Sequence, residues 1–215
     1  MFDLLVKVIP LAIGSTLSPV VFGIALTLLG GKHYPKQRTL AYLLGAVLTV
    51  VILAFVGMLI GTGAVAGSQL APSPSIDILI GFLLIIFGLK TLFSKEKEKS
   101  DIALGHEKTS SQLAKWLFIG FVVNITNFDA VMLNITAIKE IFESGAGYEI
   151  LLTVICDVLF LLPILLPLFV YLLMPSTAKK ILEPVGSAAE KYGKYILAAI
   201  FLIFGIYMLS KGLPL

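Results

Sequence analysis

Six apolar runs alternate with shorter polar stretches along the chain, and each run is long enough to cross a bilayer. A membrane-spanning helix needs about 20 mostly apolar residues to cross ~30 Å of hydrocarbon. The runs are Leu4–Leu29, Thr39–Ile60, Ile76–Phe93, Leu113–Ile138, Ile150–Leu173 and Lys194–Ser210. This pattern predicts an all-α integral membrane protein with six transmembrane helices.

The composition supports this fold class and adds an orientation. Of the 215 residues, 58% are hydrophobic and 13% charged, which is too apolar for a domain whose whole surface meets water. The first, third and fifth connections with their flanks hold three, six and four of the 16 cations, and the others are Lys7, Lys139 and Lys211. Because short cytoplasmic loops carry the excess of Lys and Arg, we expect a multi-pass protein of the cell (inner) membrane with both termini outside.

A polar stretch at 94–112 divides the chain into two parts, 1–93 and 113–215, with three runs each. We expect this stretch to be a solvated cytoplasmic linker. Ile86-Phe87-Gly88-Leu89 in the third run is similar to Ile203-Phe204-Gly205-Ile206 in the sixth. Repeats with an odd number of spans lie in opposite orientations, as in many secondary transporters. We therefore expect two three-helix inverted repeats, with chance matching of apolar residues as the alternative.

The first and fourth runs are interrupted by polar or helix-breaking residues at corresponding places. The interrupting residues are Ser15, Thr16, Ser18 and Pro19 in the first run, and Asn124, Thr126 and Asn127 in the fourth. Pro19 has no amide hydrogen, so it leaves the helical acceptor at Ser15 without its usual donor. Two interpretations remain open: the hydroxyls and amides repair a kink locally, or the loosened turns line a substrate or ion pathway.

Two acidic residues, Asp129 and Asp157, lie inside the fourth and fifth runs. Counted from the outer ends of their runs, they lie ~13 Å and ~12 Å deep at 1.5 Å per residue. Carboxylates within spans usually serve function, and two of them close together tend to share a proton or a cation. We add both acids to the candidate pathway. The alternative is that each forms a separate structural hydrogen bond, for example between Asp157 and Thr153.

Other kinds of chemistry lack support in the sequence. Cys156 is the only cysteine, which excludes an internal disulfide and a paired-thiol redox motif. His33 and His106 have no metal-ligand spacing, and the chain has no Walker motif, zinc motif or serine nucleophile setting. The cations follow one membrane face without an aromatic or Arg-rich pattern, so nucleic acid is not an expected partner. We expect neither enzymatic activity nor a cofactor, and the sequence assigns no metal.

The organisation resembles the LysE exporter superfamily. The resemblance is carried by the two sets of three runs, the Ser-x-x-Ser-Pro at 15–19, and the basic loop that leads into Leu40-Ala41-Tyr42-Leu43-Leu44-Gly45. Within that superfamily the chain is most similar to the GAP branch of glycolipid- and sulfolipid-addressing proteins. The resemblance implies that the first and fourth spans are matched, so that Ser15, Ser18 and Pro19 would face Asn124 and Asn127.

Other branches of the superfamily export amino acids or metal cations, and one moves electrons through a cysteine pair that this chain lacks. Asp129 departs from the apolar character of the addressing branch, which keeps a cation- or proton-coupled exporter in consideration.

We therefore predict a secondary transporter that exports a small solute or cation with proton or cation coupling. One alternative is a lipid or glycolipid translocation or addressing protein, whose groove should open sideways to the bilayer. Another is a non-transporting membrane scaffold subunit, which should be a sealed bundle. Expected partners are membrane lipids and the solute, cation or lipid substrate, and a homodimer is left open.

Overall fold

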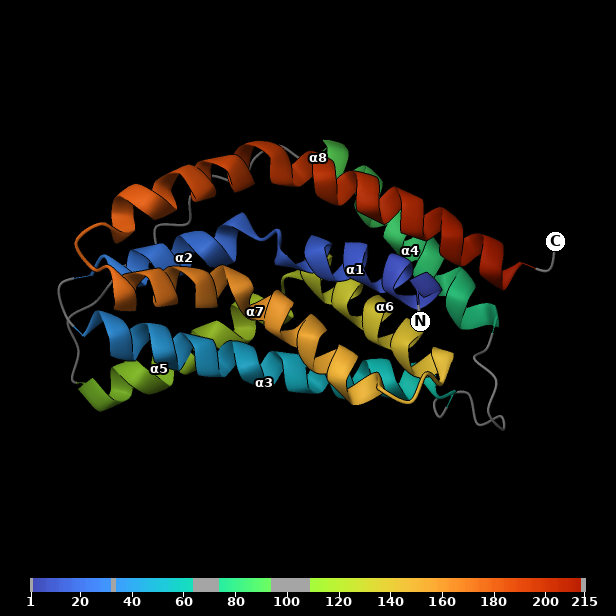
Figure 1. The fold of residues 1–215 in the computed structure, drawn as a ribbon, viewed down its shortest axis with the longest axis horizontal. Helices are drawn as coiled ribbons and strands as arrows, with labels where there is room; N and C mark the ends of the chain where they lie inside the picture. The colour runs from blue at the N-terminus through green and yellow to red at the C-terminus, as the bar shows by residue number, and fades with distance from the viewer. Residues whose placement is uncertain (1, 32–33, 64–73, 94–108, 214–215) are drawn as a thin grey trace.

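The structure is a computed structural model that describes residues 2–31, 34–63, 74–93 and 109–213. Every regular element within these ranges is a helix. The helices are α1 (Phe2–Thr16), α2 (Pro19–Leu29), α3 (Pro35–Gly61), α4 (Pro74–Phe93), α5 (Thr109–Ile125), α6 (Phe128–Ser144), α7 (Glu149–Leu173) and α8 (Ala178–Gly212). Figure 1 shows them running roughly along the long axis of the molecule, with both chain termini toward the same end. We call this the terminal end.

Two of the predicted spans are broken helices. α1 and α2 meet at an angle of 47°, and the α5–α6 pair, from Leu113 onward, is bent by 70°. α3, α4, α7 and the Tyr195–Gly212 part of α8 are each long and apolar enough to cross a membrane. The described residues thus hold four candidate spans, or six if each bent pair is one span, in agreement with the six apolar runs.

The outer surface of the bundle is apolar, as expected of helices solvated by lipid. Large side chains on several helices are more than half exposed, among them Val51, Phe82, Phe169 and Ile203. In a water-soluble protein such a surface would drive aggregation or mark an interface. Together with the candidate spans, it indicates a multi-pass membrane protein.

The last helix differs from its predicted range. We expected a span from Lys194, whereas α8 begins at Ala178 and extends over 35 residues. Its first part contains charged residues that interrupt the apolar pattern but are good helix formers, such as Lys180 and Lys191. The apolar run therefore marked the lipid-spanning part of α8 and missed the part before it. The predicted linker at 94–112 lies outside the described residues as far as 108, and α5 begins at Thr109.

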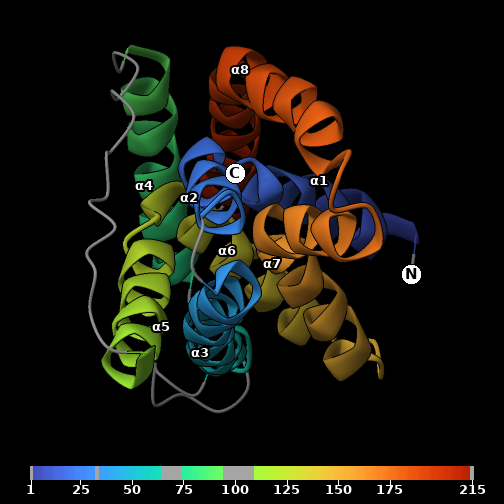
Figure 2. The same ribbon diagram turned by 90° about the vertical axis from the view of Figure 1, so that its left-hand side faces the viewer.

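Glycines bring helices into close backbone contact. A Cβ atom on Gly45 of α3 would lie 2.0 Å from the Leu117 carbonyl oxygen of α5, and one on Gly120 would lie 2.1 Å from the Tyr42 carbonyl oxygen. α4 packs along α8 in the same way, with Gly81 against Gly205. Figure 2 shows both pairs, α3 beside α5 and α4 beside α8. Such close packing is a main source of helix association in lipid, where the hydrophobic effect is absent.

Candidate functional site

The first break lies between Thr16 and Pro19 and is repaired by hydroxyl groups. The Leu17 amide bonds to the Gly14 carbonyl at 3.0 Å instead of continuing the α-helical pattern. The Ile13 carbonyl thereby loses its helical donor, and the Thr16 hydroxyl donates to it. Ser15 is buried, and its hydroxyl donates to the Ala12 carbonyl at 2.8 Å. Pro19 begins α2, where its missing amide hydrogen costs nothing.

The second break, between Ile125 and Phe128, has a similar construction. The Thr126 hydroxyl donates to the Val122 and Val123 carbonyls at 2.6 Å and 3.4 Å, and the Thr16 hydroxyl donates to the corresponding carbonyls of Ala12 and Ile13. The Phe128 amide bonds to the Thr126 carbonyl at 2.9 Å, and the Ser18 amide bonds to the Thr16 carbonyl at the same distance. The same two-residue break therefore occurs in both halves of the chain.

The two breaks meet in space. The Nδ2 atom of Asn127 donates to the Oγ atom of Ser18 at 3.0 Å, although the residues are 109 positions apart. Ser18 precedes α2 and Asn127 precedes α6, and neither side chain caps its own helix. Two helix N-termini, each with the positive end of a helix dipole, therefore lie beside one hydroxyl–amide pair. We call this the break crossing.

The other candidate residues of the breaks are bonded locally. Asn124 is buried, and its Nδ2 atom donates to the Gly120 carbonyl at 2.7 Å within its own helix. Ser15, Thr16 and Thr126 likewise bond to carbonyls of their own helices. The structure thus brings Ser18 and Asn127 together, while the remaining polar side chains follow the local-repair interpretation.

The two acids lie on different helices. Asp129 is in the first turn of α6, close to the break crossing in sequence, and is half-buried. Asp157 is half-buried in α7, and its Oδ1 atom accepts a hydrogen bond from Asn134 of α6 at 3.2 Å. Its partner is therefore an amide on another helix and not Thr153. The Asn134 Oδ1 and Thr153 Oγ1 atoms are buried without a hydrogen-bond partner among the residues that the structure describes.

A second polar centre, which the sequence pattern does not predict, lies at the terminal end. Lys139 is fully buried, and its Nζ atom donates to Asp77 of α4, to Glu140 at 3.2 Å and to Glu143 at 2.5 Å. The Nζ atom of Lys211 lies 2.8 Å from Glu140 Oε1 and 2.6 Å from Glu143 Oε1. We call these five residues the ion-pair cluster; it joins α4, α6 and α8.

The cluster changes the interpretation of two cations. In the sequence, Lys139 and Lys211 bear only on the orientation of the chain, but in the structure both belong to helices and pair with carboxylates. The spacing of Lys139 and Glu143, four residues apart, was the available signal. Oxygen atoms of Asp77, Glu140 and Glu143 lie within 4.8 Å of one another, close enough for a cation site. The Lys139 ammonium group already pairs with all three, so we assign no metal there.

The membrane spans, the two broken helices and their crossing define the class as a multi-pass membrane protein with polar groups inside the bundle. The chain matches the family described as Sap, sulfolipid-1-addressing protein, over residues 8–214. It belongs to this family, which confirms the resemblance to the sulfolipid-addressing branch. No curated protein and no solved structure matches the chain.

Proposed function

We propose that the chain is a secondary transporter whose passage runs through the break crossing. The observation that carries the proposal is the hydrogen bond between Ser18 and Asn127, which joins two interrupted spans. Secondary transporters commonly bind their substrates where discontinuous helices from two related halves meet near the middle of the membrane. In this proposal the substrate crosses chemically unchanged and the protein is not an enzyme.

An inverted repeat is part of the proposal and is supported by the packing of the helices. In such a repeat α1, α2, α3 and α4 correspond to α5, α6, α7 and α8. The contact of α3 with α6 then has its counterpart in that of α7 with α2, and the contact of α3 with α5 in that of α7 with α1. α4 and α8, which correspond to each other, pack side by side. The similar hydrogen bonding of the two breaks fits the same relation.

The helix N-termini indicate what kind of group the crossing accepts. The positive ends of α2 and α6 favour a substrate with an anionic or hydrogen-bond-accepting group over a bare cation at this point. We therefore propose a small solute with such a group. On opening, this group would replace the Ser18–Asn127 hydrogen bond, which joins the two breaks in the structure described here.

Asp129 and Asp157 are the proposed coupling groups. The role of Asp157 is supported by its surroundings. Its partner Asn134 has a buried Oδ1 atom, and Thr153 has a buried hydroxyl group. Neither of these two groups has a hydrogen-bond partner among the described residues. Such oxygen atoms would accept a hydrogen bond from a proton donor or coordinate a cation. Asp129 is supported by its place one residue after the start of α6. With both termini outside, transport would be directed toward the face that carries the ion-pair cluster.

A second candidate function is the translocation or addressing of a lipid. The observation that favours it is membership of the sulfolipid-addressing family. A sulfolipid headgroup is anionic, so the positive helix ends at the break crossing suit it as well. The two candidates differ in whether the substrate leaves the bilayer.

Transport into and out of vesicles tests the proposal. The purified chain in vesicles should release loaded amino acids or organic anions faster when a proton gradient is applied. Ser18→Ala should reduce the rate about tenfold, since one hydrogen bond to a polar or charged group contributes about 1.5 kcal/mol. Ser210→Ala is the matched control, because the Ser210 hydroxyl bonds only within α8 at an exposed position.

Equal rates for Ser18→Ala, Ser210→Ala and the unaltered chain would refute a passage at the break crossing. Movement of a labelled anionic lipid between leaflets, without release of any solute, would instead support the second candidate. A chain that moves neither would support the scaffold alternative.

A further inference from the structure

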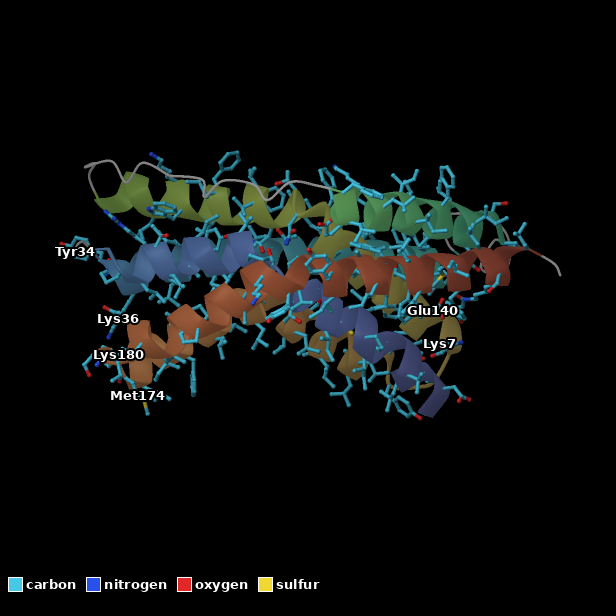
Figure 3. The ribbon with its side chains drawn as sticks, turned by 90° about the horizontal axis from the view of Figure 1, so that it is seen from above. Lys7, Tyr34, Lys36, Glu140, Met174 and Lys180 are labelled. Atoms are coloured by element: carbon cyan, nitrogen blue, oxygen red, sulfur yellow. The ribbon has the colours of Figure 1, made fainter. Side chains whose placement is uncertain are left out.

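We propose that a pocket at the terminal end of the bundle binds the zwitterionic headgroup of a phospholipid. The pocket has a volume of about 490 Å³, and its lining includes Asp3, Lys7, Glu140, Glu143, Tyr148 and Lys211. Figure 3 shows Lys7 and Glu140 at this end, far from Tyr34, Lys36 and Lys180 at the other. The inference does not rest on the proposed function, because the pocket and the break crossing are built from different residues.

The charges around the pocket determine which headgroup fits. Three carboxylates, those of Asp3, Glu140 and Glu143, face two ammonium groups, those of Lys7 and Lys211. Lys139 and Lys211 already pair with Glu140 and Glu143, so Asp3 and Lys7 are the opposite charges left for the two ends of a headgroup. A headgroup with a phosphate and an ammonium group meets an opposite charge at both ends, and such charge-assisted hydrogen bonds are the strong ones.

Lys7 is the cation best placed to receive the phosphate. Lys211 already pairs with Glu140 and Glu143. The Nζ atom of Lys7 lies 5.2 Å from the centroid of the Tyr207 ring, a contact that orients the ammonium group. Lys7 is also half-buried on α1 and lines the pocket.

An apolar pocket adjoins the polar one and accounts for the rest of the lipid. It has a volume of about 250 Å³ and is lined by Leu4, Leu5, Tyr148, Leu151 and Leu152. Leu4 and Tyr148 line both pockets, so the two lie side by side. A free polar solute would leave the apolar pocket without an occupant, whereas a phospholipid would place its headgroup in one and the start of an acyl chain in the other.

Equilibrium binding to the purified full-length chain in detergent tests the assignment. We expect phosphatidylethanolamine to bind about tenfold more tightly than phosphatidylglycerol, whose headgroup lacks the ammonium group, and than free phosphoethanolamine, which lacks the chains. Lys7→Gln should weaken phosphatidylethanolamine binding about tenfold through the loss of one charge-assisted contact. Lys36→Gln, at an exposed position at the other end, should leave it unchanged.

A second variant tests the acyl site separately. Leu151 is largely exposed beside the apolar pocket, so Leu151→Ala should weaken binding of the lipid but not of phosphoethanolamine. Equal affinity for the two lipids, or equal effects of Lys7→Gln and Lys36→Gln, would overturn the headgroup site. Phosphoethanolamine binding as tightly as the lipid would overturn the assignment of an amphiphile. None of these measurements involves transport, so failure here leaves the break crossing untouched.

Discussion

Replacing Lys139 by methionine should destabilise the protein strongly, because this side chain holds three carboxylates together inside the bundle. Methionine has nearly the length of the lysine stem, so the substitution removes the charge while filling much of the space. The Nζ atom of Lys139 contacts Asp77, Glu140 and Glu143, and the side chain has no solvent exposure. The variant therefore leaves buried acids without their common partner.

The size of the effect follows from the geometry of the ion-pair cluster. The carboxylate oxygen atoms lie within 4.8 Å of one another. At an effective dielectric constant of about 20, two unit charges at that separation repel by about 3.5 kcal/mol. Lys211 remains beside Glu140 and Glu143 and offsets part of this repulsion. Removing one partner from a buried ion pair costs about 3–5 kcal/mol, and we expect a loss in that range.

Reversible unfolding in detergent micelles, followed by circular dichroism, measures this loss of free energy. Lys36→Met is the matched control, because Lys36 is exposed at the other end of the bundle, and its stability should change by less than about 0.5 kcal/mol. Adding Glu143→Gln to Lys139→Met should recover part of the lost stability, since it removes one of the repelling charges. A loss below about 1 kcal/mol for Lys139→Met, or no recovery in the double variant, would refute the described role of the cluster.

Three further predictions concern packing, coupling and orientation. Gly120→Ala should separate α5 from α3 and lower the midpoint of thermal unfolding, because the new Cβ atom would lie 2.1 Å from a carbonyl oxygen of α3. Gly23→Ala is the control, because the space around Gly23 is open. Equal midpoints for the two variants would contradict the contact. Asp129→Asn and Asp157→Asn should each abolish gradient-driven transport in vesicles while leaving the chain inserted, and normal coupled transport by both would remove the coupling role. An impermeant thiol reagent on intact cells should label a cysteine at Ser144 and not one at Lys36; the opposite result would reverse the orientation.

The helices and their breaks were predictable from the sequence because both leave a pattern along the chain. Apolar runs of spanning length located the helices that cross the membrane. The polar interruptions near Pro19 and Asn127 marked the two breaks, since a missing amide hydrogen or an amide side chain interrupts the helical hydrogen bonding locally. That these two breaks contact each other rested on the resemblance and the expected repeat, because no local pattern encodes a contact between distant residues.

The ion-pair cluster was not predictable in the same way. Lys139 follows an apolar stretch and precedes Glu140, so it looks like the first residue of a solvated loop. Its burial depends on Asp77 of α4 and on Lys211 of α8, which approach it only through helix packing. The early start of α8 was missed for a related reason, because the residues before Tyr195 form a helix without an apolar run of spanning length. A charge pattern alone does not distinguish a solvated loop from charged side chains that form ion pairs inside the bundle.

The contact between Ser18 and Asn127 sets an order for the biogenesis of the protein. The two residues are 109 positions apart, so a ribosome that adds about 5–20 residues per second reaches Asn127 roughly 5–20 s after Ser18. During this interval the first broken helix lies in the membrane before its partner exists. The hydroxyls of Ser15 and Thr16 bond within α1 and need no second half, so they can protect the open backbone while the chain is being made. The local hydrogen bonds of Ser15 and Thr16 contribute least to a substrate site, but they stabilise the first broken helix in lipid until the second is made.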